Sequence, residues 1–394
     1  MEAAHAAYAR ADPLFYDKPG RRGHDSSELF AVPETRDWTM WARVDDDHWT
    51  HWLPRTQALP EQGWKIHVST VPRSAATILA LTAEFCHERG LAFKHVRSRL
   101  HLGLSLAKDA DRGSAGKFIT IYPTSDAQLQ KALEGLDRLV GGHPGPYVLS
   151  DVRWRRGPLF VRYGAFLPLL TVHAGRRVPA LRDPRTGALV PDVRAPYFHL
   201  PAWVDAPAFL QGEIDALADA TPPAGFPKIS SALHHSNAGG VYAATIDDRR
   251  IVLKEARPHS GWTPDGRDAV DRLVDEERTL ARLPRDVSAP RTIGVLRAHG
   301  HRFLALEHVE GASLMDAVVL RNPLTDRAGS PEAAAAYRAW ALSVSDELRR
   351  QVKALHAAGL SHGDLHPRNV VIADDGAVSL LDFEMSQPVS ADAS

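Results

Sequence analysis

Strict alternation of apolar and polar residues over 64–70 predicts a β-strand. Successive side chains of a strand point to opposite faces, so Trp64 and Ile66 would face a core while Lys65 and His67 share the other face. The pattern therefore predicts a sheet with one buried face and one face that presents titratable groups.

Helical and strand patterns alternate after this strand. Amphipathic helices are predicted over 77–89 and 125–140, and strands over 91–96, 118–122 and 159–163. Gly90 is a typical residue at a helix C-terminus, and Ser125 is a typical N-cap. Several tryptophans lie among charges before residue 60 and predict a short helical and extended entry segment. The alternation is typical of one α+β domain, which we place at residues 1–217.

A stretch rich in proline and glycine over 221–227 predicts a domain boundary, and we place a linker at 218–228. The second domain would comprise residues 229–394. It is predicted to contain a hairpin formed by 241–246 and 250–255, helices over 268–283 and 332–358, and strands over 303–307, 370–372 and 378–381. Both domains therefore belong to the α+β class.

The composition excludes several partners and compartments. Basic and acidic residues number 47 and 48 in a chain of 394, which argues against nucleic acid or a membrane surface as the main partner. Cys86 is the single cysteine, which excludes an internal disulfide and a cysteine-rich zinc site and suits a reducing compartment. No signal peptide follows Met1, and the most apolar runs are too short to span a bilayer. We therefore expect a cytoplasmic protein.

Polar residues near the end of the chain indicate phosphoryl transfer. Asp364 and Asn369 lie in the segment SHGDLHPRN, and Asp382 lies in the segment LDFE. Phosphoryl transfer needs a carboxylate that orients the attacking hydroxyl and oxygen ligands for Mg²⁺ across the phosphates. Asp364 can take the first role, and Asn369 with Asp382 can take the second. These segments resemble the catalytic and metal-binding loops of protein kinases, in the form shared with aminoglycoside phosphotransferases.

A phosphotransferase also needs a glycine-rich cover, a lysine that reaches the phosphates and an acid that positions the lysine. Gly239 and Gly240 lie between predicted strands, where main-chain N–H groups could approach phosphate oxygens. Lys254 ends the run Ile-Val-Leu-Lys, and Glu276 lies on the following helix. Glu307 would begin the hinge that faces adenine. We therefore predict that the second domain binds ATP or GTP with Mg²⁺.

Titratable residues gather on predicted strands of the first domain. Lys65, His67 and Lys94 lie on neighbouring strands. The arginines that follow in the same domain are Arg112, Arg153 and Arg162. Arginine forks bind a phosphate dianion, a lysine desolvated among cations can act as a base, and a histidine can protonate a departing oxygen. Each residue alone fits a solvated strand face, but together they predict β-elimination of phosphate from phosphoserine or phosphothreonine.

The chain resembles the class III lanthipeptide synthetases. The segments LPEQGWKIHVS, ADRGSAGKFITIYP, PGPYVLSD and GPLFVRYG are similar to the N-terminal lyase domain of that family. The run from HHSNAGGVYAA to VLKEARPHSG is similar to the kinase that follows. The resemblance implies a relation to the phosphothreonine lyases of bacterial effectors, whose Lys-x-His strand matches Lys65 and His67 and whose basic lysine matches Lys94. It also implies that the three arginines bind phosphate, with Arg155 or Arg156 as alternatives to Arg153.

The resemblance further implies a pathway that acts on a ribosomal precursor peptide. The kinase phosphorylates Ser and Thr in the core of a peptide recognised through its leader. The lyase then eliminates phosphate to give dehydroalanine and dehydrobutyrine. A C-terminal cyclase adds cysteine thiols across these alkenes to form lanthionine-type rings.

The sequence departs from the family pattern in two places. Glu384 replaces the glycine that usually follows Asp-Phe, which argues against regulation by flipping of this loop. The chain stops at Ser394, so we expect an incomplete kinase C-lobe and no cyclase domain. Two other functions stay open, namely a small-molecule phosphotransferase of the aminoglycoside-kinase type and a non-catalytic leader-binding fragment.

Overall fold

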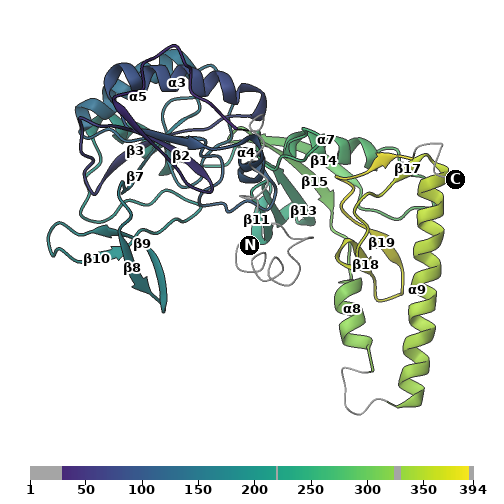
Figure 1. Ribbon diagram of the computed structural model, residues 1–394. Coiled ribbons are helices and arrows are strands. Elements are labelled where there is room, and N and C mark those ends of the chain that lie inside the picture. Colours follow the sequence, from purple (N-terminus) through teal and green to yellow (C-terminus); the bar gives the residue numbers. More distant parts are fainter. Residues whose placement is uncertain (1–28, 219–220, 324–329, 390–394) are drawn as a thin grey trace. The chain divides into compact units, whose positions relative to one another are not determined.

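The computed structural model describes residues 29–218, 221–323 and 330–389 (Figure 1). The predictions for residues 1–28, for 219–220 within the linker and for 390–394 lie outside these ranges. The chain divides into two units. The first comprises the described residues up to Thr221 together with Ser236–Ala238 and Arg257–Asp268, and the second comprises Pro222–His235, Gly239–Ala256 and the described residues from Ala269. Strands and helices occur in both units, so the predicted α+β class is confirmed.

The first unit is built around a seven-stranded sheet in the order β1-β2-β4-β5-β3-β7-β6. The strands are β1 (Trp41–Asp45), β2 (Trp49–Pro54), β3 (Gln62–Val68), β4 (Phe93–Val96), β5 (Ile119–Ile121), β6 (Val152–Arg153) and β7 (Leu159–Ala165). All of these neighbours pair antiparallel. The strands predicted over 64–70, 91–96, 118–122 and 159–163 are therefore confirmed as members of one sheet.

Two helices cover one face of this sheet, as Figure 1 shows: α3 (Ala75–Arg89) and α5 (Asp126–Val140). Ser125 caps α5 as predicted, because its side chain accepts a hydrogen bond from the main-chain N–H of Gln128. Ile66 of β3 is fully buried in the core between sheet and helices, and Trp64 is 7% exposed. The alternation along β3 then turns Lys65 and His67 to the opposite face of the sheet.

Shorter elements complete the first unit. They are α4 (Arg99–Leu106), α6 (Gln211–Ala218) and a three-stranded sheet of β8 (Leu170–His173), β9 (Arg176–Arg182) and β10 (Leu189–Pro191). Two later segments join this unit through main-chain hydrogen bonds. The N–H of Asn237 donates to Lys108 O at 2.9 Å, and the N–H of Trp262 donates to Leu106 O at 3.0 Å. The chain therefore does not divide at a single point, unlike the arrangement expected from its proline-rich stretch.

The second unit begins with a five-stranded antiparallel sheet in the order β11-β12-β13-β15-β14. Its strands are β11 (Lys228–His235), β12 (Gly240–Ile246), β13 (Arg249–Ala256), β14 (Thr292–Ala298) and β15 (His301–Glu307), and α7 (Ala269–Leu280) packs against the sheet. The predicted β12–β13 hairpin is confirmed. Its turn residues Asp247 and Asp248 both have positive φ angles, 47° and 61°, as a two-residue hairpin turn requires.

The remaining elements of the second unit are short strands and two helices. They are β16 (Ala312–Ser313), α8 (Leu314–Arg321), α9 (Pro331–Ala357), β17 (Leu360–Ser361), β18 (Val370–Ile372), β19 (Val378–Leu380) and β20 (Gln387–Pro388). β18 pairs antiparallel with β19, so the two strands predicted on either side of the polar loops are confirmed. Within the ranges given above, no helix has the length and apolar character needed to cross a bilayer.

Candidate active sites

The strand register gathers basic side chains on the face of the first sheet that is turned away from α3 and α5. Thr120 of β5 pairs with His67 of β3 on one side and with Lys94 of β4 on the other. Lys65 of β3 pairs with Arg162 of β7. Directly opposed residues of antiparallel strands point to the same face, so these four titratable groups share one surface. We call this surface the cationic face.

Lys65 and Arg162 also approach each other closely. A Cβ atom built on Gly164 would lie 3.0 Å from Arg162 Nη1 and 3.2 Å from Lys65 Nζ, so both cationic groups lie beside this glycine. Lys65 is only 8% exposed. Burial lowers the pKa of Lys65 well below its ordinary value, and the charge of Arg162 lowers it further, while Asp192 opposes the shift. Lys65 therefore loses its proton more readily than a solvated lysine does.

Lys94 lies in a similar but milder environment. Its Nζ atom lies 4.1 Å from the centre of the Trp49 ring, which is a cation–π distance. Burial lowers the pKa of Lys94 to about 8, and the nearby charge of Arg194 contributes to the shift. Lys94 is therefore mostly charged at pH 7 but titrates just above it.

His67 belongs to a buried hydrogen-bonded network that the sequence did not predict. Its Nδ1 atom pairs with Asp151, whose other carboxylate oxygen lies 3.2 Å from Lys117 Nζ and accepts from Ser150 Oγ at 2.7 Å. A carboxylate only accepts, so Nδ1 bears the proton. Burial lowers the pKa of His67 to about 3, although Asp151 opposes this shift.

Asp151 stays ionised in this network. Burial alone would raise the pKa of its carboxyl, but Lys117 and His67 lower that pKa below its ordinary value. Asp151 precedes β6 and Lys117 precedes β5, so neither lies in the alternating strand pattern that indicated the others. Only their spatial relation to His67 identifies them.

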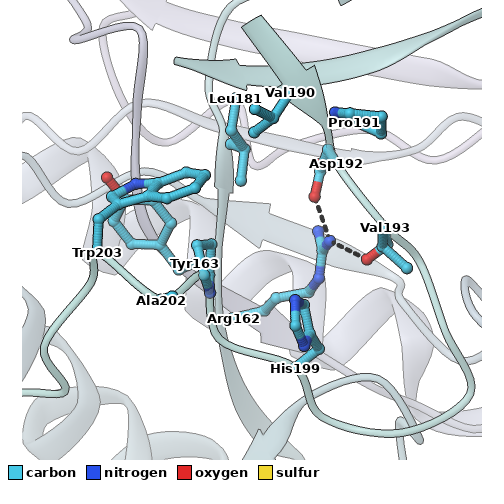
Figure 2. Close-up of a pocket in the computed structure, with 11 residues that line it drawn as sticks. Arg162, Tyr163, Leu181, Val190, Pro191, Asp192, Val193, His199, Ala202 and Trp203 are labelled. Atoms are coloured by element: carbon cyan, nitrogen blue, oxygen red, sulfur yellow. Dashed lines mark hydrogen bonds and ion pairs between the residues drawn. The ribbon is translucent and has the colours of Figure 1, made fainter. Parts of the chain in front are cut away.

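Arg162 points into a cavity of about 250 Å³ in the first unit (Figure 2). Its Nη2 atom donates to Asp192 Oδ1 and, at 3.0 Å, to Val193 O. Figure 2 shows these two bonds on one side of the cavity and the Trp203 ring on the other. The segment that follows β10 thus supplies the partners of this arginine.

The other two predicted arginines are placed differently. Arg153 donates from Nε to Gly157 O at 2.9 Å and from Nη2 to Arg156 O, so its guanidinium is engaged by the main chain. Arg112 has a buried Nε atom without a hydrogen-bond partner in the described chain. By strand register Arg153 also lies on the cationic face, because it pairs with Phe160 of β7 and Phe160 pairs with His67 of β3. Arg162 in addition lies close to Lys65.

The second unit contains an ion-paired lysine between two acids. Lys254 Nζ lies 2.5 Å from Glu276 Oε1 and 2.8 Å from Asp382 Oδ1. Burial alone would lower the pKa of Lys254, but the two carboxylates raise it above its ordinary value. Burial raises the pKa of Glu276, whose Oε1 also accepts from the main-chain N–H of Phe383 at 3.2 Å. The lysine expected of a phosphotransferase therefore contacts both the helix acid and the loop acid.

Asp364 and Asn369 also lie together. Asn369 Nδ2 donates to Asp364 O at 2.9 Å and to Asp364 Oδ2 at 3.3 Å, which leaves the amide oxygen of Asn369 as the atom suited to bind a cation. The described chain contains no group of three or more His, Cys, Asp or Glu side chains that could hold a metal by themselves. An amide oxygen with one carboxylate does fit Mg²⁺, because this ion is usually bound by one or two protein groups together with phosphates and water.

Gly239 and Glu307 mark the predicted nucleotide contacts. Gly239 has a φ angle of 156°, and a Cβ atom there would lie 2.0 Å from Glu255 O, so only glycine allows this close approach. Gly240 follows at the start of β12. Glu307 ends β15, where its carboxylate pairs with Arg249 at 2.8 Å and its N–H donates to Arg291 O at 2.9 Å. It also lines a cavity of about 870 Å³ together with the loop around Pro284.

Each unit of the chain contains a match to one known protein family. Residues 29–220 match the family described as RamC, N-terminal domain, and residues 320–389 match the phosphotransferase enzyme family. A probable SapB synthase of Streptomyces coelicolor is 41% identical over a 401-residue alignment that covers 99% of this chain and 42% of the relative. The chain thus spans less than half the length of that synthase.

Two protein kinases match shorter stretches. The serine/threonine-protein kinase PknL of Mycobacterium tuberculosis is 33% identical over 91 residues, which is 23% of this chain and 20% of the relative. CBL-interacting protein kinase 22 of Oryza sativa subsp. japonica is 29% identical over 149 residues, which is 36% of this chain and 31% of the relative.

Proposed function

Because this chain is a homologue of the RamC-type class III lanthipeptide synthetases, we propose that it modifies a ribosomal precursor peptide in the cytoplasm. The first unit would eliminate phosphate from phosphoserine or phosphothreonine, and the second would belong to the kinase that installs it. One observation supports the elimination above all others: Lys65, His67 and Lys94 lie on one face of one sheet, beside Arg162.

The elimination needs a base, an acid and a phosphate site. Neutral Lys65 removes the proton from Cα of the phosphorylated residue. Burial lowers its pKa, and it is more deeply desolvated than Lys94. The electron pair of the Cα–H bond forms the Cα=Cβ double bond while the Cβ–O bond breaks. The phosphate leaves with the bridging oxygen, and the products are a dehydroamino acid and inorganic phosphate.

His67 is the proposed acid. The low pKa of His67 keeps its imidazole neutral, with the Nδ1 proton donated to Asp151. A bound phosphate dianion raises the pKa of a neighbouring imidazole, so the substrate itself supplies the charge that favours the imidazolium. The protonated ring then donates to the departing oxygen, and Asp151 stabilises the charge that forms on it.

The proposed kinase chemistry rests on the second unit. Asp364 would orient the substrate hydroxyl, and Lys254 would contact the nucleotide phosphates while Glu276 holds it in place. Asn369 and Asp382 would hold Mg²⁺, which supplies positive charge across the phosphates when bound. ATP and GTP are equally compatible with these contacts.

A phosphoserine peptide tests the lyase directly. Incubated with the chain without nucleotide and followed by mass spectrometry, it should lose phosphoric acid. Lys65→Arg should abolish this loss, because a guanidinium stays protonated, and His67→Ala and Lys94→Ala should also reduce it strongly. Lys131→Arg, at an exposed position of α5, serves as the matched control and should leave the rate unchanged. An unchanged peptide with the unmodified chain would reject the lyase.

An Asp364→Asn variant of the full-length synthetase tests the division into two sites. It should stop dehydration of the unphosphorylated precursor yet leave the phosphopeptide reaction intact. Asp374→Asn, in an exposed turn of the same unit, is the control and should affect neither reaction. Loss of both reactions in Asp364→Asn alone would contradict separate sites.

A small-molecule phosphotransferase is the second candidate, and the match of residues 320–389 to the phosphotransferase enzyme family favours it. ATP consumption in the presence of a Ser- and Thr-containing peptide, compared with consumption in the presence of aminoglycosides, separates the two. A nucleotide turnover stimulated only by the small molecules would favour this candidate over the peptide kinase.

A further inference from the structure

Two cations near the cationic face are already compensated by acids. Arg162 pairs with Asp192, and Lys117 pairs with Asp151 at 3.2 Å. Each pair has no net charge, so a phosphate dianion that approaches them must compete with a carboxylate. Arg153, whose guanidinium donates to two main-chain oxygens, is a further cation by register, but a guanidinium without such contacts would bind a dianion more readily.

The two remaining lysines do not supply a permanent charge. Burial lowers the pKa of Lys65 well below its ordinary value and that of Lys94 to about 8. If Lys65 acts as the base, it must be neutral when the substrate binds. An arginine, in contrast, keeps its charge at any pH that proteins tolerate.

The chain leaving β10 brings such an arginine to the face. Arg162 Nη2 donates to Val193 O at 3.0 Å, which fixes the residue before Arg194. The carbonyl of Arg194 would lie only 2.4 Å from a Cβ atom at Gly113, and Gly113 O in turn lies 3.4 Å from Lys117 Nζ. The main chain of Arg194 is therefore held between β7 and the loop that bears Lys117, and the absence of a side chain at Gly113 allows this approach.

Unlike Arg162, Arg194 does not have its charge compensated by an acid in the described part of the chain, so its guanidinium can bind an anion. Its side chain is exposed, and it forms no ion pair with any residue that the structure describes. Its charge lowers the pKa values of Lys65, Lys94 and Lys117, in each case as an addition to the effect of burial. These three lysines lie on different segments, so the charge of Arg194 acts on the whole group and not on one lysine alone.

We propose that Arg194 binds the phosphate of the phosphorylated substrate residue, as an uncompensated guanidinium held at the edge of the cationic face by Gly113 and Val193. The proposal deepens the proposed lyase function and rests on it for the identity of the substrate. It adds a phosphate-binding residue outside the strands that were expected to supply the site. It also gives the small sheet of β8, β9 and β10 a role, because this sheet delivers the segment that contains Arg194.

Peptide binding without turnover tests the proposal. A fluorescent phosphoserine peptide and its unphosphorylated counterpart are titrated into the Lys65→Met variant, which retains an uncharged residue at the base position. Adding Arg194→Ala should raise the Kd of the phosphopeptide about 10- to 100-fold, the usual effect of losing a charged hydrogen bond. Arg194→Lys should restore part of the affinity. Arg177→Ala, at an exposed position on β9, is the control and should have no effect.

Two further measurements separate phosphate binding from a structural role. In the chain that retains Lys65, Arg194→Ala should raise the KM of phosphate elimination by about the same factor as the Kd. The kcat should change little, as expected for a contact that is equally strong in the ground state and the transition state. Gly113→Ala should reproduce this increase, because its methyl group displaces the Arg194 carbonyl. Equal Kd values for Arg194→Ala and Arg177→Ala, or an equal loss of affinity for the unphosphorylated peptide, would overturn the proposal.

Failure of the elimination and failure of this inference give different results. If the chain binds the phosphopeptide through Arg194 but releases no phosphate, the lyase assignment fails while Arg194 remains a phosphate ligand. If elimination proceeds and Arg194→Ala behaves as the control does, only the role of Arg194 fails. A chain that does not distinguish the phosphorylated from the unphosphorylated peptide overturns the role of Arg194 as well.

Discussion

Arg272 on α7 forms an ion pair with Glu384, with 3.4 Å between Nε and Oε2. The arginine side chain is 1% exposed and that of Glu384 is 16% exposed, so the pair is almost completely removed from water. Glu276 on the same helix accepts from the N–H of Phe383 at 3.2 Å. These two contacts fasten the loop that contains Asp382 to α7 and hold Glu276 beside Lys254. The residue that departs from the protein-kinase pattern thus anchors the predicted metal-binding loop.

The Arg272–Glu384 pair should contribute to stability. We expect Glu384→Gln to lower the free energy of unfolding of the second unit by about 1–3 kcal/mol, because it weakens the partner of a buried charge. Hydrogen exchange of the α7 amides under native conditions measures this change without assuming that the whole chain unfolds in one step. The double variant Arg272→Met/Glu384→Leu should recover part of the loss. Unchanged α7 protection in Glu384→Gln would contradict the prediction.

Burial of Lys65 should lower the free energy of unfolding of the chain. Its pKa in the folded chain lies well below the value of an unfolded lysine, so the unfolded state binds more protons over the interval between them. This contribution to the free energy of unfolding therefore increases as the pH rises through that interval, and is unfavourable below it. Lys65→Met should raise the unfolding free energy by about 1–2 kcal/mol at pH 7 while abolishing elimination.

Thermal unfolding at several pH values checks this prediction. The gain in Tm from Lys65→Met should be largest at pH values below the lowered pKa of Lys65 and should shrink as the pH approaches 10. Lys131→Met on the exposed face of α5 provides the comparison and should leave Tm unchanged. A Tm that falls in Lys65→Met would show that the charged lysine is stabilising instead.

Asp151→Asn should impair elimination through His67. The amide can no longer accept as a charged partner, so it neither fixes the Nδ1 proton nor stabilises an imidazolium. We expect kcat for phosphopeptide elimination to fall about 10- to 100-fold with a much smaller change in KM, the usual effect of altering a group that orients a catalytic residue. Asp137→Asn, whose carboxylate pairs with Arg155 on the surface, is a suitable control.

Phosphopeptide affinity should pass through a maximum with pH. A phosphate monoester gains its second negative charge near pH 6, so affinity should first increase as the pH rises. Lys94 has a pKa of about 8 and loses its charge above that value, so affinity should then decrease. Fluorescence titration between pH 5 and about 9.5 measures both limbs. In Lys94→Arg the descending limb should disappear, and its persistence would assign the loss of charge to another group.

Local patterns in the sequence determined much of this protein. Period-two alternation identified β3 and turned Lys65 and His67 to a common face, because side-chain direction along a strand depends on the local backbone alone. The segments around Asp364 and Asp382 indicated phosphoryl transfer because their residue types and spacing reflect the chemistry itself. The proline-rich stretch indicated two domains, but it did not reveal that residues 236–238 and 257–268 join the first unit.

Only the tertiary structure decided which distant residues share a site. The order β4-β5-β3-β7 places His67 and Arg162 on neighbouring strands and puts β5 between His67 and Lys94, which were expected on neighbouring strands. Long connections separate all three residues along the chain. Asp151, Lys117 and Arg194 lie in loops, where no repeating pattern sets the direction of a side chain. Their positions result from long-range pairing and close main-chain approach, and these depend on the packing of the whole unit rather than on neighbouring residues in the sequence.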